Sequence, residues 1–180
     1  MNYAKVRSLD ISNGPGQRVS VFFQGCSHHC KNCFNPETWN PNYGSEWNKR
    51  KRSIVLDLCG KEDIVGLSLL GGDPLYWFRK ENDAYYENRT EMLDFVLSFK
   101  KKYPNKTLWI WTGYTWEELM SSDKLTQPLT KEFIEFADVI VDGLFIEELK
   151  VPNLKWRGST NQRIIDVKES IRTNTVVLYE

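Results

Sequence analysis

Three of the four cysteines are crowded into one short segment, where Cys26, Cys30 and Cys33 have the spacing C-x3-C-x2-C. Clustered thiols of this kind are more typical of a metal site than of a disulfide framework. Zinc prefers four closed ligands, whereas iron–sulfur clusters prefer cysteine thiolates. Three thiolates would leave one iron of a 4Fe-4S cluster without a protein ligand, so that a substrate could bind it directly. We therefore predict that these cysteines hold such a cluster.

Two other ligand sets stay open on spacing alone. His28 or His29, inside the cysteine segment, would complete a Cys3His zinc site. Cys59 would supply a fourth thiolate, although its place beside Leu58 in an amphipathic stretch favours a buried core thiol. A zinc site or a fully ligated cluster would make the chain a metal-binding or electron-transfer module rather than an enzyme.

The cysteines directly follow an apolar run at 19–23, which has the branched and aromatic composition of a strand. Similar short runs predict strands at 64–70, 107–111, 138–141 and 163–167. Stretches with helical spacing lie between them, around residues 54–58, 92–99 and 133–136. Alternating strands and helices predict parallel βαβ units, and such sheets bind ligands at the carboxyl ends of their strands.

The predicted fold is α/β, a single domain over residues 1–180. We expect an open or partial (β/α) barrel of parallel strands, preceded by an antiparallel strand at 3–11. A full eight-fold barrel needs about 250 residues, so a wall built from 180 residues must be incomplete. Segment 75–88 mixes aromatic and charged residues, and we predict a long loop there. Its aromatic side chains would pack on the domain edge or dock a partner.

The overall charge is balanced, with 24 Lys and Arg residues against 24 Asp and Glu residues. No net field would therefore attract nucleic acid or an acidic membrane. The basic run at 49–52 is interpreted as a solvated helix start. No apolar stretch approaches the ~20 residues of a membrane span, and the N-terminus lacks a secretion-signal pattern. We expect a cytoplasmic protein with no nucleic-acid or membrane partner.

A second motif, Gly71-Gly72-Asp73-Pro74, follows the predicted strand at 64–70. Together with the cysteine segment it resembles the two signatures of the radical S-adenosylmethionine (SAM) superfamily, in the expected order and places. Four further segments look like those of the family that activates anaerobic ribonucleoside-triphosphate reductases. They span nearly the whole chain and lie at 13–16, 33–39, 111–119 and 156–163.

The resemblance implies a glycyl-radical activating enzyme whose cofactors are one 4Fe-4S cluster and SAM. The amino and carboxylate groups of SAM would chelate the open iron, and an electron from the cluster would cleave SAM into methionine and a 5′-deoxyadenosyl radical. That radical would take a hydrogen atom from a glycine of the large reductase subunit, the protein partner. An external donor such as flavodoxin or ferredoxin would supply the electron. An activase of the pyruvate formate-lyase type is the nearest alternative, although it usually has a longer chain.

The resemblance also implies which residues form the SAM site. Gly71 and Gly72 would let backbone groups approach the ligand, Asp73 would accept from its ammonium group, and Pro74 would stiffen the turn. Many superfamily members have an aromatic residue immediately before the third cysteine. Because Asn32 stands there, adenine stacking would fall to a neighbour. The predicted cofactor-binding set is Asn32, Cys33, Phe34, Gly71, Gly72, Asp73, Pro74, Thr112 and Asp142.

Polar residues near later strand ends leave two interpretations open. Thr112 and Asp142 would line the SAM site or only cap their strands. Arg157, Gln162 and Arg163 would recognise SAM or the partner's glycine loop, or would form surface salt bridges. No separate catalytic side chain is expected, since hydrogen-atom transfer to a carbon radical depends on distance and alignment.

Overall fold

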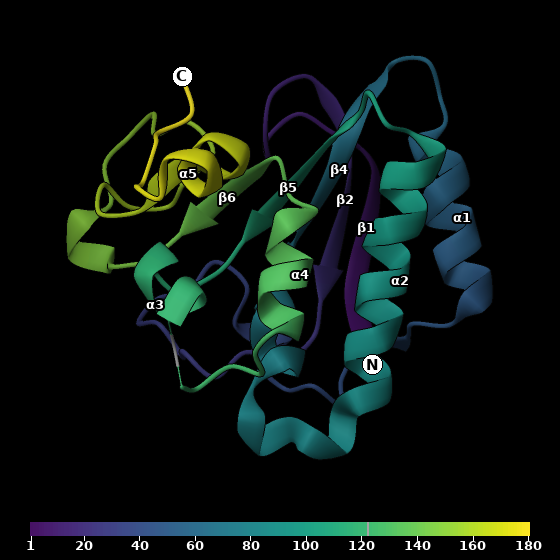
Figure 1. Ribbon diagram of the computed structural model, residues 1–180, viewed down its shortest axis with the longest axis horizontal. Coiled ribbons are helices and arrows are strands. Elements are labelled where there is room, and N and C mark those ends of the chain that lie inside the picture. Colours follow the sequence, from purple (N-terminus) through teal and green to yellow (C-terminus); the bar gives the residue numbers. More distant parts are fainter. Residues whose placement is uncertain (122) are drawn as a thin grey trace.

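The residues described in the computed structural model, 1–121 and 123–180, form one seven-stranded sheet with the order β3-β1-β2-β4-β5-β6-β7 (Figure 1). β2, β4, β5 and β6 run parallel, whereas β1 pairs antiparallel with β2 and β3, and β7 pairs antiparallel with β6. The strands are β1 (Asn2–Asp10), β2 (Gln17–Phe23), β3 (Ser45–Glu46), β4 (Ile64–Gly71), β5 (Thr107–Trp111), β6 (Val139–Asp142) and β7 (Arg163–Asp166).

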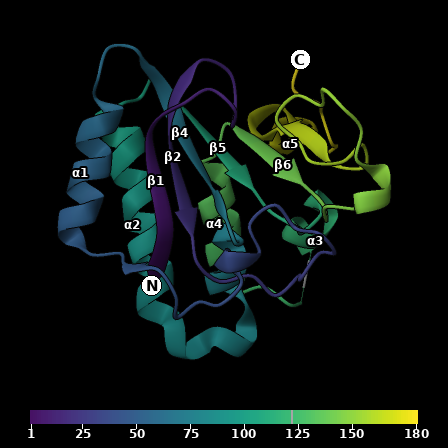
Figure 2. The same ribbon diagram turned by 180° about the vertical axis from the view of Figure 1, so that it is seen from behind.

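Three helices cover one face of this sheet: α1 (Lys49–Cys59), α2 (Tyr86–Lys102) and α4 (Leu129–Glu135) (Figures 1 and 2). The shorter helices α3 (Trp116–Ser121) and α5 (Val167–Thr173) follow β5 and β7. Alternate strand residues point toward the helices, because side chains of a strand alternate between its faces. They form the main core with apolar helix residues, among them Val21, Phe23, Leu67, Leu69, Phe95, Phe99, Ile110 and Ile140.

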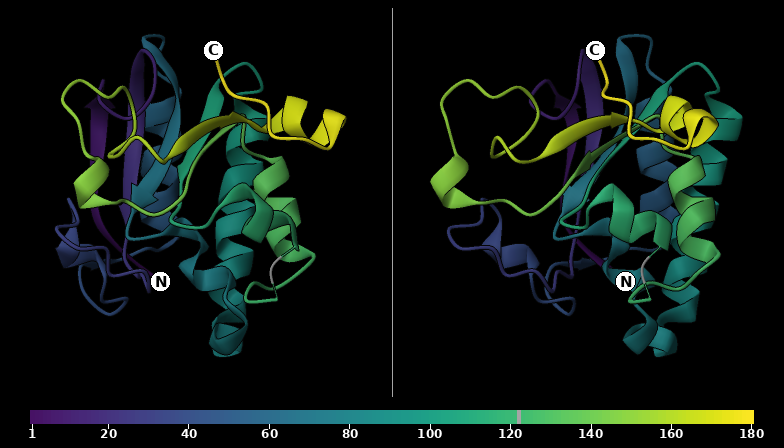
Figure 3. Two further views of the ribbon diagram at one scale, coloured as in Figure 1. Left: turned by 90° about the vertical axis from the view of Figure 1, so that its left-hand side faces the viewer. Right: turned by 60° about the vertical axis from the view of Figure 1, so that its left-hand side comes forward.

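Two long segments, 24–44 and 143–162, lie on the opposite face (Figure 3). A smaller apolar cluster on that face is built from Trp109, Val139 and Val141, against which Trp156 and Tyr179 pack. The segments begin at the carboxyl ends of β2 and β6. The sheet therefore presents a thick core on one side and loops on the other.

Most of the predicted strands are confirmed, and one is corrected in direction. The α/β class and the antiparallel N-terminal strand agree with the structure. The prediction that 163–167 runs parallel was wrong, because β7 pairs antiparallel with β6, with Ile164 opposite Val141. A parallel return requires a crossover, usually a helix. Segment 143–162 holds only the short 3-10 helix η4 (Glu147–Leu149) and turns straight back.

The prediction of a long irregular loop at 75–88 was also wrong. This stretch forms the 3-10 helices η2 (Pro74–Phe78) and η3 (Lys80–Tyr85), and then enters α2. Leu75 and Phe78 are fully buried in the main core, as is nearly all of Trp77. Burial of these side chains holds the backbone in short helical turns that no regular apolar spacing indicates. The expected packing of aromatic residues on the domain is confirmed for Trp77 and Phe78.

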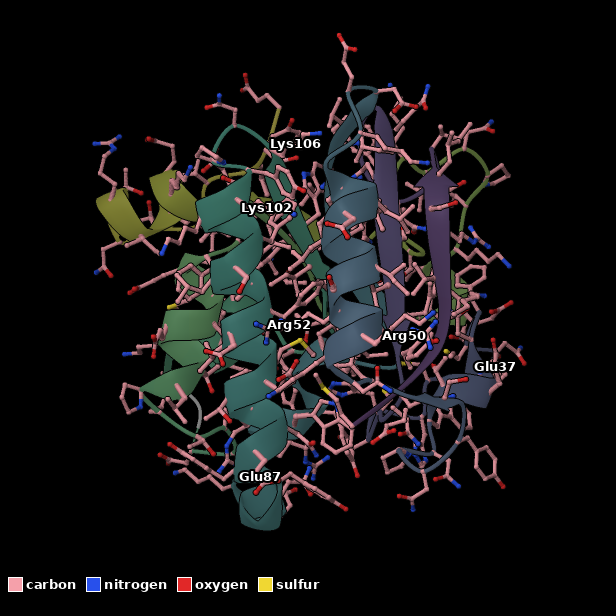
Figure 4. All side chains as sticks on the ribbon, turned by 90° about the vertical axis from the view of Figure 1, so that its right-hand side faces the viewer. Glu37, Arg50, Arg52, Glu87, Lys102 and Lys106 are labelled. Carbon is pink, nitrogen blue, oxygen red and sulfur yellow. The ribbon has the colours of Figure 1, made fainter. Side chains whose placement is uncertain are left out.

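The basic run at 49–52 begins α1, as predicted, and the side chain of Asn48 caps that helix. Arg52 bridges to Glu91 on α2 at 3.2 Å, and Lys102 bridges to Asp57 at 3.0 Å (Figure 4). Arg52 and Lys102 therefore link the neighbouring helices α1 and α2.

Among the described residues, no helix is both long enough and apolar enough to cross a bilayer.

Candidate active site

The cysteine segment leaves the carboxyl end of β2 and is fixed there by its own return. The Gly25 N–H donates to the Thr38 carbonyl at 2.8 Å, and the Cys26 N–H donates to the Trp39 carbonyl at 3.1 Å. The short 3-10 helix η1 (Pro36–Thr38) supplies the first of these acceptors. The segment is therefore a closed loop whose two ends are tied together beside the sheet.

The Gly71-Gly72-Asp73-Pro74 motif ends the neighbouring strand β4 and contacts the cysteine loop directly. The Gly72 N–H donates to Phe23 at 2.9 Å, and the Asp73 N–H donates to the Gly25 carbonyl at 2.8 Å. A Cβ added at Gly72 would collide with the carbonyl oxygen of Gly25, and Gly71 has a left-handed φ of 115°. The two glycines thus have a packing role: they let the two loops touch through their backbones.

The Asp73 carboxylate is the centre of a buried polar network and is only 2% exposed. Its Oδ2 accepts from Thr112 Oγ1 at 2.9 Å and from the Gly113 N–H at 3.0 Å, and it lies 2.9 Å from His28 Nε2. Its Oδ1 accepts from the Leu75 N–H at 2.9 Å. A carboxylate satisfied in this way holds together the loops that follow β2, β4 and β5.

These loops surround a cavity of about 390 Å³. Nine of the predicted site residues line it: Cys26, Cys30, Cys33, Phe34, Gly71, Gly72 and Thr112, together with Arg157 and Gln162 of segment 156–163. The cavity has the size of a small-molecule site, and it lies at the carboxyl ends of parallel strands, where α/β sheets bind ligands.

Four predicted cofactor-binding residues are absent from the lining of this cavity: Asn32, Asp73, Pro74 and Asp142. Asn32 is exposed and has a left-handed φ of 53°. Pro74 is buried at the start of η2. Asp142 is 1% exposed and accepts from the Trp116 N–H at 2.7 Å, which is the geometry of a strand-end cap.

The polar residues of segment 156–163 make different contacts and have different roles. Gln162 is buried and accepts from the Gly158 N–H at 2.7 Å, while its amide donates to the Gly143 carbonyl at 2.9 Å. It therefore holds segment 143–162, here called the strap, in a folded shape. Arg163 pairs with Asp142 and with Glu117 on α3.

The strap lies against the cysteine loop and forms one wall of the cavity. The Phe34 and Phe145 rings are 4.9 Å apart, and the Lys150 ammonium lies 4.9 Å above the Phe34 ring. Lys31 also bridges to Glu148 at 2.7 Å. Phe34 is 58% exposed, so one side of its ring stays accessible beside the cavity.

Burial disfavours the thiolate form of two of the cavity cysteines. Loss of solvent raises the pKa of Cys26 to about 12, and the nearby Asp73 charge acts in the same direction. Burial likewise raises the pKa of Cys30. Because metal binds thiolates, a metal bound by these two cysteines would displace their protons. Cys59 lies in the main core on α1 and is fully buried there, so the prediction of a buried core thiol is confirmed.

The donor set fits a cluster better than a single zinc ion. Among the described residues, no three His, Cys, Asp or Glu side chains converge closely enough to hold one ion. The cysteines instead share one cavity, as a cluster with one thiolate on each of three irons requires. His28 is hydrogen-bonded to Asp73, and the ring of His29 stacks on that of Trp39 with ring centroids 4.7 Å apart. Each histidine thus has a protein partner in this structure.

Comparison with known proteins places this site in a family. A family model described as a 4Fe-4S single cluster domain matches residues 12–165. The anaerobic ribonucleoside-triphosphate reductase-activating protein of Vibrio cholerae is 39% identical over 168 residues, which cover 91% of this chain and 97% of the relative. The chain belongs to this family of activating proteins. It therefore carries an iron–sulfur cluster domain of a redox enzyme.

Other members of the family show the same extent of similarity. The activating protein of enterobacteria phage T4 is 37% identical over 164 residues, covering 91% of this chain and 93% of the relative. The activating protein of Escherichia coli K12 is 35% identical over 164 residues, which cover 90% of this chain and 96% of the relative. The similarity thus includes the cysteine loop, the glycine motif and the strap.

Sequence reasoning considered His28 as a zinc ligand and missed it as a structural link. It also missed Arg7, Trp111 and Trp156 in the cavity lining. The segments at 13–16, 111–119 and 156–163 were noted for their resemblance, and residues from each of them line the cavity. The bond from His28 to Asp73 spans 45 positions and has no local signal.

Proposed function

We propose that this protein activates the anaerobic ribonucleoside-triphosphate reductase by reductive cleavage of SAM, which leaves a glycyl radical on the large reductase subunit. One observation carries the proposal: the three clustered cysteines and the two glycines of the Gly71-Gly72-Asp73-Pro74 motif line the same cavity at the carboxyl ends of parallel strands. The relatives' names identify the reductase as the protein they activate. The assignment to the radical SAM type and the use of SAM rest on the resemblance of the motifs.

Cys26, Cys30 and Cys33 would each bind one iron of a 4Fe-4S cluster and leave the fourth iron open. When bound, the cluster and SAM supply the redox chemistry, and the protein orients them. The loop tied through Gly25 and Cys26 keeps the thiols at the cavity wall. The raised pKa of Cys26 means that cluster binding, rather than pH, would hold this thiol in its ionised form.

The cavity wall would bind SAM through backbone groups of Gly71 and Gly72 and through Thr112. Phe34 would offer its accessible ring to the adenine, beside Asn32 and Cys33. Arg157 would meet an anionic or carbonyl group of the ligand or partner, because its side chain lines the cavity.

The satisfied carboxylate of Asp73 would position these groups rather than accept directly from the SAM ammonium. Pro74 would keep the turn in shape, and Asp142 would cap β6 through Trp116 and Arg163. The open sheet would serve as the partial barrel of a radical SAM fold within a single domain. Its loop-bearing face would receive the reductase, and an external flavodoxin or ferredoxin would supply electrons in the cytoplasm.

The test is SAM cleavage by the anaerobically reconstituted protein, with and without the reductase. We expect methionine release and a glycyl doublet in the electron paramagnetic resonance (EPR) spectrum of the reductase. Replacing Cys26, Cys30 or Cys33 by Ala should abolish both signals, while Cys59→Ala, a control in the core, should keep them. A doublet that forms only on a pyruvate formate-lyase would contradict the reductase assignment, and a protein with one zinc and no sulfide would contradict the enzyme.

A further inference from the structure

His28 lies between the first two cysteines of the loop, yet its side chain points into the polar network rather than to solvent. The side chain is 15% exposed, and its Nε2 lies 2.9 Å from Asp73 Oδ2. A carboxylate oxygen only accepts hydrogen bonds, so His28 Nε2 is the donor of this pair. The cysteine loop is thereby joined by a side chain to the glycine motif of β4.

The acceptor atom of this bond is shared with the next strand. Asp73 Oδ2 also accepts from Thr112 Oγ1 at 2.9 Å and from the Gly113 N–H at 3.0 Å. The loops that follow β2, β4 and β5 therefore meet at a single oxygen. Movement of the imidazole would change the position of the cysteine loop relative to both other loops.

The site also has space for this ring. A Cβ added at Gly113 would lie 2.5 Å from His28 Cδ2, so the glycine leaves space for the imidazole. The ring of Tyr114 meets it edge-on at a centroid distance of 4.7 Å. The next residue, His29, is exposed and stacks on Trp39 instead. Two adjacent histidines thus have different surroundings, and only one enters the network.

We propose that His28 is a positioning residue that fixes the three cluster cysteines relative to the SAM-binding ends of β4 and β5. It acts through Asp73, whose carboxylate it contacts directly. Without the bond, the cysteine loop would still be tied by Gly25 and Cys26 but would lose its side-chain link to the SAM site. This inference rests on the proposed function, because it assumes that cluster and SAM share the cavity.

The test compares three variants of the whole chain. His28→Phe keeps a ring but removes the donor, His28→Gln keeps a donor, and His29→Phe applies the same ring change one position along. We measure iron content, SAM affinity and the change that SAM causes in the EPR spectrum of the reduced cluster. We expect His28→Phe to bind SAM about tenfold more weakly and to lose the SAM-induced spectral change. His28→Gln should stay within about threefold of the unmodified protein, and His29→Phe should match it.

A second measurement needs neither cluster nor SAM. Hydrogen exchange at the Gly113 amide of the metal-free protein should be at least about fivefold faster in His28→Phe than in His28→Gln, because the shared acceptor would lose its position. If His28→Phe loses its iron while His28→Gln retains it, the loop has been displaced and the proposal is supported. Equal SAM affinity and equal exchange in the two variants, or equal losses in both, would overturn it. Failure of the unmodified protein to bind SAM would instead contradict the proposed function, and the exchange experiment would still decide the role of His28.

Discussion

The two faces of the sheet differ in what holds them together. On the helix-covered face, α1, α2 and α4 pack on strand side chains such as Val21 and Leu69, which are fully buried. On the other face, loops from β2, β4 and β5 meet through hydrogen bonds around Asp73 and leave a cavity of about 390 Å³. Apolar packing therefore supports the fold on one face, whereas backbone and polar contacts shape the site on the other.

This difference implies that stability and cofactor binding respond to different substitutions. Changes in the helix-covered core should lower the free energy of unfolding and spare the site in the molecules that remain folded. Changes in the loop network should affect iron and SAM binding more than stability. The following substitutions test that separation.

Phe99→Ala, in the core between α2 and the sheet, should have the largest effect on stability. Phe99 is fully buried, and removing such a ring leaves a cavity that costs about 3–5 kcal/mol. Urea unfolding measures the loss. Leu97→Ala on the same helix is the control, because Leu97 is 49% exposed and its truncation should cost less than about 1 kcal/mol. Similar losses in the two variants would contradict the assignment of this face as the stabilising one.

Gly72→Ala should damage the loop-bearing face. The new Cβ would collide with the backbone of Gly25 and Thr38, and overpacking of this kind costs about 1–3 kcal/mol. Because the collision displaces the cysteine loop, iron content after reconstitution should fall about tenfold. Gly60→Ala, at the end of α1, is the matched control, since its φ of −75° suits alanine and the atom nearest to the new Cβ is the hydroxyl at the end of the Tyr103 side chain. Full iron content in Gly72→Ala would show that the contact between the loops is not needed.

Gln162→Leu should loosen the strap. The Gly158 N–H and the Gly143 carbonyl would lose their partner, and buried groups left unpaired cost about 1–3 kcal/mol. Arg157 and Trp156 would then lose their fixed places at the cavity, so SAM should bind several-fold more weakly. Titration calorimetry measures that affinity. Asn161→Leu is the control, because this neighbouring amide is exposed and makes one hydrogen bond, to the Leu144 carbonyl at 2.8 Å. An equal loss of affinity in that variant would contradict the role of Gln162.

Asp138→Asn should have the smallest effect, at the end of the sheet away from the cavity. Burial alone would raise the pKa of Asp138, but hydrogen bonds from Lys100, the Leu108 N–H and Lys168 outweigh it and lower the pKa. The ionised carboxylate therefore stabilises the fold above the unfolded-state pKa of about 4, and this contribution is lost as the pH falls through the lower folded-state value.

Removing the charge should lower the free energy of unfolding by about 1–2 kcal/mol near neutral pH. It should also weaken the decrease of this free energy as the pH falls. Urea unfolding between about pH 7 and pH 3 measures both effects. Cluster loading at neutral pH should be unchanged. If the free energy of unfolding of the variant decreases as steeply with falling pH, another titratable group controls the acid sensitivity.

The parts of this structure that were predictable from sequence have local signals. The apolar runs at 19–23, 64–70 and 107–111 have strand composition, and the cysteine spacing and the glycine motif directly follow two of these runs. Because carboxyl ends of parallel strands share one edge of a sheet, the motifs had to meet there. The prediction that Cys59 is a core thiol succeeded because its helical neighbours are apolar.

The parts that were not predictable depend on contacts between distant segments. The direction of β7 depends on how the strap folds back through Gln162, and the helical turns of 74–85 depend on the burial of Leu75 and Phe78. The bond between His28 and Asp73 joins two motifs that sequence reasoning treated separately. None of these contacts has a periodicity that a single sequence displays.

In the proposed function, three thiolates leave one iron open for SAM. The most direct measurement is electron–nuclear double resonance on the reduced, reconstituted protein with SAM that is isotope-labelled at its amino nitrogen and its carboxylate oxygens. Direct ligation predicts hyperfine coupling of both groups to the cluster, retained in Cys59→Ala. Absence of any coupling, with a protein side chain found on the fourth iron, would contradict the account.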